Sequence, residues 1–158
     1  MEASEGLEEL SRLADDPALL ERFEYYVDRL RELLSSPRHR FDPASPVPEL
    51  PGVYVVRRGD EVIYVGSTGN LRRRLLGDHL RGNVEGSWLR RALSWDLGIA
   101  PVGARARLSR VEEDRISEHL RMSCTFQYIV EEDERKRVMI EHFAIALLSP
   151  RLASPIRL

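Results

Sequence analysis

The sequence predicts an α/β (α+β) fold, in which helices flank a small antiparallel or mixed sheet of three strands. Two runs rich in β-branched and aromatic residues, 53–56 and 62–65, are joined through Gly59-Asp60, a pattern typical of a β-hairpin. A later run, Cys124–Val130, predicts the third strand. Helices are expected around these strands, because apolar residues elsewhere recur at intervals of three and four.

The N-terminal segment, residues 1–35, is expected to form an acidic helical extension. It contains ten acidic residues and four arginines, and its leucines and aromatic residues follow helical spacing. Asp16-Pro17 divides the segment, since proline suits the first turn of a helix, which predicts a short helix and then a second one over Pro17–Ser35. Residues 36–50 carry four prolines and predict an extended linker to a domain at 51–158.

The rest of the chain contains alternating helix and strand signals. Asn70 and Ser87 are suitable N-caps for the two helices that follow the hairpin. Pro150 predicts the end of the last helix, because the residue before a proline disfavours helical backbone. The elements expected after the hairpin are helices from 71 and over 87–98, a strand at 104–108, a helix at 111–121, the strand described above and a helix at 133–148.

The composition is typical of a folded domain outside a membrane. Of 158 residues, 42% are hydrophobic and 32% are charged. No run approaches the roughly eighteen apolar residues that a membrane-spanning helix requires, and the first residues lack the pattern of a secretory signal, so a cytoplasmic protein is expected. The single cysteine, Cys124, excludes an intramolecular disulfide and a thiolate cluster for zinc.

Two short motifs at the ends of the hairpin indicate a family. Gly52-Val53-Tyr54 is followed, after nine residues, by Tyr64-Val65-Gly66. Arg74 follows on the next predicted helix and Glu141 on the last one. In this order the motifs resemble those of the GIY-YIG nucleases, over about residues 51–154. The resemblance implies a GIY-YIG-like fold and an endonuclease that hydrolyses DNA phosphodiester bonds with Mg²⁺ or Mn²⁺, the metal being bound by Glu141.

The resemblance also implies roles for the remaining site residues. Tyr54 becomes the candidate general base, Tyr64 the residue that orients the attacking water, and Arg74 the ligand of the scissile phosphate. His79 has a supporting role, since some family members place a histidine near this position. Elementary chemistry offers second interpretations: tyrosines on adjacent strands commonly pack together, and Arg74 can pair with Asp78 one turn later. A phenol with a pKa of roughly 10 also needs a nearby cation to act as a base.

Glu141 is informative without any resemblance. It falls on the apolar side of the last predicted helix, which it shares with Ile140, Ala144, Ile145 and Leu148. A carboxylate there is costly unless it is paired or bound to a cation. One carboxylate together with waters and a substrate phosphate is a normal environment for magnesium, whereas no His, Cys and Asp cluster suggests a transition-metal site.

The charge distribution favours a basic patch in the middle of the chain. The net charge is −2, but residues 70–91 contain six arginines and two acidic residues. The expected partner is DNA, with RNA left open, and no membrane partner is expected. The residues expected to contact nucleic acid are Gly66, Ser67, Asn70, Arg72, Arg73, Arg90 and Arg91.

Two departures from the family pattern leave alternatives open. Ala153 stands where many members have an asparagine, and Ser67 where some have a lysine. The missing asparagine favours a catalytically degenerate nucleic-acid-binding module of the same fold. A third hypothesis is a protein–protein adaptor in which residues 1–35 bind a partner or a second copy as a homodimer, since their acidic charge repels phosphate.

Overall fold

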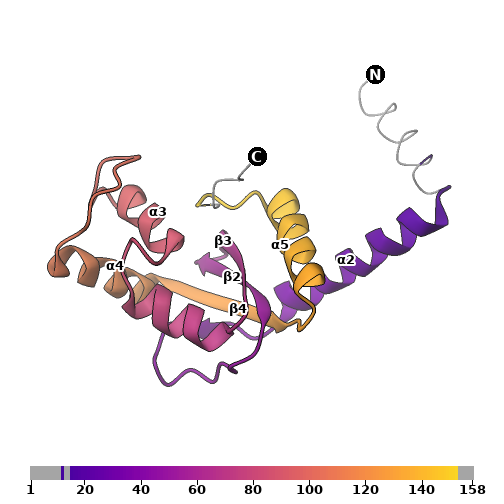
Figure 1. The fold of residues 1–158 in the computed structure, drawn as a ribbon, viewed down its shortest axis with the longest axis horizontal. Coiled ribbons are helices and arrows are strands. Elements are labelled where there is room, and N and C mark those ends of the chain that lie inside the picture. The colour runs from indigo at the N-terminus through magenta and orange to yellow at the C-terminus, as the bar shows by residue number, and fades with distance from the viewer. Residues whose placement is uncertain (1–11, 13–14, 153–158) are drawn as a thin grey trace.

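An antiparallel sheet of four strands forms the centre of the molecule (Figure 1). The computed structural model describes residue 12 and residues 15–152, and the following account covers these. The α+β class and the hairpin of β2 and β3 are confirmed. The strand order is β1-β4-β2-β3, with β1 at His39–Arg40, β2 at Gly52–Arg58, β3 at Glu61–Thr68 and β4 at Cys124–Val130.

Five helices flank this sheet in the described part of the chain. Asn70 accepts a hydrogen bond from the Arg73 N–H (3.0 Å) and Ser87 one from the Arg90 N–H (3.2 Å), so both predicted caps are confirmed. The short helix predicted before Pro17 lies, apart from residue 12, outside the described residues. None of the described helices is long and apolar enough to cross a membrane. The helices are α2 (Pro17–Ser35), the π-helix η1 (Arg73–His79), α3 (Trp88–Asp96), α4 (Arg110–Ser123) and α5 (Glu134–Leu148).

Two predictions about strands are wrong. The sheet has four strands rather than three, because β1 in the proline-rich linker pairs with β4; two residues are too few to show an alternating pattern. The strand predicted at residues 104–108 is a loop. Its carbonyl groups bind side chains of α3 instead of a sheet partner: the Ala104 carbonyl accepts from Trp95 Nε1 (3.0 Å) and the Ala106 carbonyl from the Arg91 guanidinium (2.7 Å).

The two faces of the sheet support two separate hydrophobic cores. Successive residues of β2 point to opposite faces, so Tyr54 packs against η1, α3 and α4, whereas Val53 packs against α2 and α5. The C-terminal half of α2 therefore belongs to the folded core, with Leu33 fully buried. Gln127 of β4 reinforces this contact by donating to the carbonyl groups of Leu34 (2.9 Å) and Ser36 (2.7 Å).

A β-bulge in β3 orients the second motif. Val56 lies opposite Tyr64 and Arg57 opposite Val62, which leaves Ile63 without a partner in the β2–β3 ladder. Ile63 and Tyr64 consequently join the same core, the one that contains Tyr54. The Ile63 carbonyl accepts from the Leu152 N–H (2.8 Å), so the segment after α5 closes over this edge of the sheet.

Leu33→Ala tests whether α2 is part of the cooperative fold. The substitution leaves a cavity between α2 and the sheet, so we expect the free energy of unfolding to fall by about 2–5 kcal/mol in urea titrations. Leu20→Ala, in the exposed half of the same helix, is the control and should change it by no more than about 0.5 kcal/mol. Equal effects of the two substitutions would contradict the packing described here.

Candidate active site

The two motif tyrosines lie side by side on the central hairpin. Their ring centroids are 6.2 Å apart, and both side chains are buried. Tyr54 lies opposite Gly66 in the β2–β3 register. A Cβ atom on Gly66 would lie 2.4 Å from the Tyr54 hydroxyl oxygen, which no real side chain tolerates. The phenol of Tyr54 therefore occupies the space that a side chain at position 66 would take, and this accounts for the glycine of the second motif.

His79 completes a cluster of three rings. Its centroid lies 5.5 Å from that of Tyr54 and 5.8 Å from that of Tyr64. Its Nε2 atom is 2.6 Å from the Tyr54 hydroxyl oxygen, and its Nδ1 atom is 2.7 Å from Ser87 Oγ. In one tautomer Tyr54 donates to Nε2 and Nδ1–H donates to Ser87; in the other tautomer both bonds reverse. Ser87, predicted only as a helix cap, thus also fixes the imidazole.

The π-helix explains why His79 lies five residues after Arg74. In an α-helix, a separation of five residues rotates the two side chains apart by about 140°. A π-turn closes between residues five apart, so Arg74 and His79 face the same side of η1. Beside the larger effect of burial, the positive charge of Arg74 opposes the rise in the pKa of Tyr54 and adds to the fall in the pKa of His79, so Arg74 lies near enough to interact with both.

Burial keeps both members of the tyrosine–histidine pair uncharged. The pKa of His79 falls from 6.5 to about 3, because desolvation and then the charges of Arg74 and Arg90 oppose its protonation. The pKa of Tyr54 is raised well above its ordinary value by burial, by Tyr64 and by the Glu141 carboxylate, against the lowering effect of Arg74. Any chemistry at this pair must therefore begin from a neutral phenol and a neutral imidazole.

Arg74 is held beside the ring cluster by an ion pair. A guanidinium nitrogen lies 3.2 Å from an Asp78 carboxylate oxygen, so the predicted alternative partner is present in the structure. About a third of each side chain is exposed, at 35% for Arg74 and 29% for Asp78. This exposure leaves the guanidinium accessible to an incoming phosphate, which could replace the Asp78 carboxylate or bind the guanidinium together with it.

Glu141 approaches the site from the other face of the sheet. Its carboxylate accepts a hydrogen bond from the Ser67 hydroxyl, which joins α5 to the end of β3. Ser67, predicted as a nucleic-acid contact, therefore has an internal partner. Neighbouring Ile140 and Ala144 are buried, whereas Glu141 itself is half-buried and His142 is exposed.

The donor set fits a hard cation bound by one carboxylate. Within residue 12 and residues 15–152, no group of three or more His, Cys, Asp or Glu side chains could enclose a metal ion. Magnesium commonly binds through one or two carboxylates and completes its coordination with waters and substrate phosphates. Glu141 with Ser67 beside it suits that mode of binding and does not suit a closed zinc site.

Arg90 and Arg91, which were predicted to contact nucleic acid, have their partners within the protein. Both guanidinium groups are buried and bonded within the protein. Arg90 pairs with Glu113 (2.7 Å) and donates to the His79 carbonyl (2.8 Å), and Arg91 donates to carbonyl groups of the 104–106 loop. Counting charges along the sequence did not reveal that this side of α3 faces the core. Arg90 instead holds the backbone of His79 in place.

Three of the other predicted nucleic-acid contacts lie at the N-terminal end of the helical segment that contains η1. Arg72 and Arg73 are exposed there, whereas the Asn70 side chain is engaged as the helix cap. Gly66 lies beneath the Tyr54 ring. The position of the missing family asparagine, Ala153, is outside the described residues.

The low pKa of His79 predicts a specific pH dependence of stability. Below pH 6.5 the unfolded chain binds a proton at this histidine and the folded chain does not, down to about pH 3. As the pH is lowered from 6.5 towards 3, the free energy of unfolding should therefore decrease by about 1.4 kcal/mol for each pH unit because of His79 alone. Urea titrations from about pH 4 to 7 should show a shallower dependence for His79→Gln than for the wild type. His142→Gln, at an exposed position, should keep the wild-type dependence; the same dependence in His79→Gln would contradict the assignment.

The sequence matches one known protein family. Residues 48–153 match the model of the GIY-YIG catalytic domain, and no curated protein matches the chain. Among solved structures, the chain is similar to the magnesium-bound N-terminal endonuclease domain of UvrC from Thermotoga maritima, with 22% identity and a TM-score of 0.37 over 68% of this chain and 86% of that one. A point mutant of the same domain, bound to its catalytic divalent cation, gives 24% identity and a TM-score of 0.39 over 69% and 88%. Since the family model covers well over half of its length, the chain belongs to the GIY-YIG family.

Proposed function

We propose that this protein is an endonuclease that hydrolyses phosphodiester bonds of DNA and depends on Mg²⁺ or Mn²⁺. The observation that carries the proposal is the convergence of chemically matched side chains from separate elements. Tyr54 and Tyr64 come from the hairpin, and His79 is within hydrogen-bonding distance of Tyr54. Arg74 and Glu141 both act electrostatically on Tyr54, one from η1 and the other from α5.

Glu141 would hold the metal ion, and Ser67 would orient its carboxylate. The hydroxyl of Ser67 donates to one carboxylate oxygen and so restricts rotation of the side chain. When bound, the metal supplies positive charge that polarises the phosphate and stabilises the negative charge developing during hydrolysis. The half-buried position of Glu141 strengthens such an interaction relative to that of a fully exposed carboxylate.

Tyr54 would act as the general base with His79 as its proton acceptor. The Tyr54 hydroxyl passes its proton to Nε2 of His79 as it takes one from the attacking water, which leaves an imidazolium and a neutral phenol. Arg74 is one cause of the low pKa of His79. A phosphate bound to Arg74 would offset that positive charge, raise the pKa of His79 and make the transfer easier when substrate is present.

Arg74 and Tyr64 would position the phosphate and the water. The planar guanidinium can donate two parallel hydrogen bonds to phosphate oxygens and stabilises the charge that grows on them in the transition state. The exposed third of the Arg74 side chain supports this role, and Asp78 would hold the side chain ready in the absence of substrate. Tyr64 packs against both other rings and would orient the water towards the phosphorus atom.

Contacts to the rest of the DNA are proposed for the start of η1. The exposed side chains of Arg72 and Arg73 are best suited to neighbouring phosphates. Gly66, Ser67 and Asn70 border the same region, where backbone groups can approach the strand. The nuclease domain is proposed to comprise residues 51–158, against which the C-terminal half of α2 packs. The part of residues 1–35 that does not pack in this core is proposed as the surface for a protein partner or a second copy.

Glu141→Gln should abolish metal-dependent cleavage. Loss of the carboxylate removes the proposed metal ligand, so nicking of supercoiled or branched DNA in Mg²⁺ or Mn²⁺ should fall by at least about a hundredfold. Glu134→Gln, an exposed position in the first turn of the same helix, is the matched control and should retain activity. Isothermal titration calorimetry should show that Mg²⁺ binds Glu141→Gln more weakly than the wild type, whereas Glu134→Gln should bind Mg²⁺ as the wild type does.

Two outcomes would overturn the proposal. Undiminished nicking by Glu141→Gln would remove Glu141 from the mechanism. Absence of nicking by the wild type on every substrate, with DNA binding retained at low salt, would instead support the catalytically degenerate binding module.

A further inference from the structure

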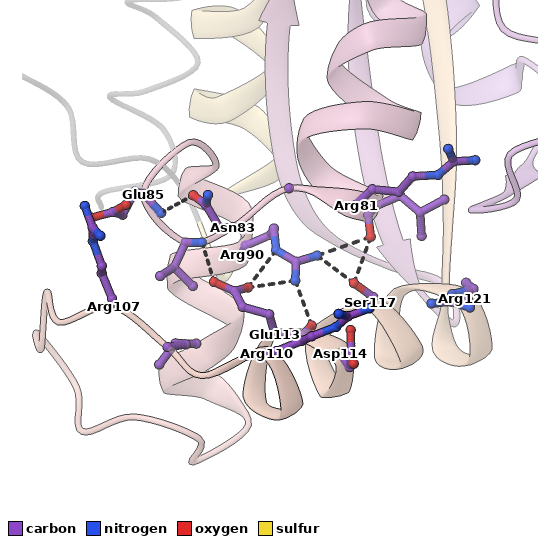
Figure 2. A pocket seen from close by; sticks show the side chains of 14 residues that line it. Arg81, Asn83, Glu85, Arg90, Arg107, Arg110, Glu113, Asp114, Ser117 and Arg121 are labelled. Atoms are coloured by element: carbon purple, nitrogen blue, oxygen red, sulfur yellow. Dashed lines mark hydrogen bonds and ion pairs between the residues drawn. The ribbon is translucent and has the colours of Figure 1, made fainter.

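A polar pocket lies behind η1, on the side of α4 (Figure 2). Its volume is about 510 Å³, and it is enclosed by the end of the helical segment that contains η1, the 82–86 loop, the loop before α4 and α4 itself. Its charged and polar lining residues are Arg81, Asn83, Glu85, Arg90, Arg107, Arg110, Glu113, Asp114, Ser117 and Arg121.

The floor of the pocket is a fixed network of buried groups. Arg90 donates to Ser117 Oγ (3.0 Å) and pairs with Glu113, as Figure 2 shows. Ser117 in turn donates to the Leu80 carbonyl (2.8 Å), and Glu113 accepts from the Val84 N–H (2.9 Å). The end of the helical segment that contains η1, the 82–86 loop and α4 are thereby tied to one another, so hydrogen bonds fix three of the four segments that enclose the pocket.

The rim of the pocket has an excess of positive charge. Arg107 pairs with Glu85 (2.9 Å), and Arg90 is neutralised by Glu113. Within the described part of the chain, the exposed side chains of Arg81, Arg110 and Arg121 form no ion pair, and Asp114 is the one remaining acidic group of the lining. Three unpaired guanidinium groups and one unpaired carboxylate leave an excess of positive charge around a polar hollow, which favours an anion with several oxygen atoms.

The pocket continues the arginine surface of the candidate active site. Arg81 also borders a smaller hollow, of about 250 Å³, with Arg72 and Arg73. Arg81 lies seven residues after Arg74 and two residues beyond the end of η1. A strand whose scissile phosphate is bound at Arg74 could therefore bring a neighbouring phosphate to Arg81.

We propose that this pocket binds backbone phosphates of a nucleic-acid strand, a few nucleotides from the bond held at Arg74. Arg110 and Arg121 lie on one face of α4, eleven residues and so roughly 16 Å apart along its axis, which is far enough for them to contact separate, non-adjacent phosphates of a strand. A free mononucleotide offers the same phosphate chemistry, but the connection through Arg81 to the η1 arginines favours the polymer. The proposal rests on the proposed function for the position of the strand.

The double variant Arg110→Gln/Arg121→Gln tests the proposal. Binding of fluorescent duplex DNA is measured by anisotropy in EDTA, so that no cleavage occurs, across a series of salt concentrations. We expect the double variant to bind the duplex at least about tenfold more weakly than the wild type. The slope of log affinity against log salt concentration should be smaller in magnitude by about 0.9 for each lost phosphate contact, or about 1.8 for both. The control, Arg115→Gln/Arg135→Gln, makes the same change in net charge at exposed positions that do not line the pocket, and should bind as the wild type does.

The outcomes separate this proposal from the nuclease assignment. Affinity and salt dependence equal to those of the control would overturn the pocket as a phosphate site, even if the variant still nicks DNA. A shallower salt dependence would support the pocket even if the wild type cuts no substrate. Adenosine monophosphate that binds the wild type as tightly as the oligonucleotide does, and binds the double variant weakly, would overturn the polymer as the ligand.

Discussion

The hydrogen bond between the Tyr54 hydroxyl and the His79 imidazole joins the hairpin to η1, and the arrangement of the site depends on it. Three separate features allow this bond. Gly66 leaves room for the phenol, the π-turn brings His79 to the same side of the helix as Arg74, and Ser87 fixes the other ring nitrogen. Because each feature comes from a different segment, only the fully folded chain satisfies all three, and buried polar groups left without partners would be costly.

Arg90 links the position of His79 to its protonation state. A buried guanidinium is unfavourable unless its charge and its N–H groups are satisfied. Glu113 and the carbonyl groups of His79 and Leu80 provide these partners. Burial is the main cause of the low pKa of His79, and the charges of Arg74 and then Arg90 add to it, so Arg90 fixes the backbone of the histidine and also contributes to keeping its ring neutral. Its network extends outward to α4, which connects the candidate active site with the basic pocket behind it.

The hairpin, the start of α2 and the principal helix caps could be predicted from the sequence, because each depends on a few neighbouring residues. These are the two β-branched runs around Gly59-Asp60, Asp16-Pro17 before α2, and Ser87 before α3. Such local signals did not suffice where tertiary contacts decide the outcome. Strand β1 exists through pairing with β4, and the carbonyl groups of the 104–106 loop bind α3 side chains instead of forming a strand. The motif order identified the family and the members of the ring cluster. Residue spacing could not show that a π-turn aligns His79 with Arg74, nor that Arg90 and Arg91 are buried.

The division of the site between the two faces of the sheet has a consequence for the order in which the candidate site is assembled during synthesis. The tyrosines belong to the core on the face covered by η1, the helix that carries Arg74, whereas Glu141 belongs to α5, which packs on the opposite face. Glu141 follows Arg74 by more than sixty residues, and chains emerge from the ribosome N-terminus first. A nascent chain thus contains both motif tyrosines and Arg74 well before Glu141 can reach Ser67, so the groups of the candidate site come together only when α5 docks on the sheet.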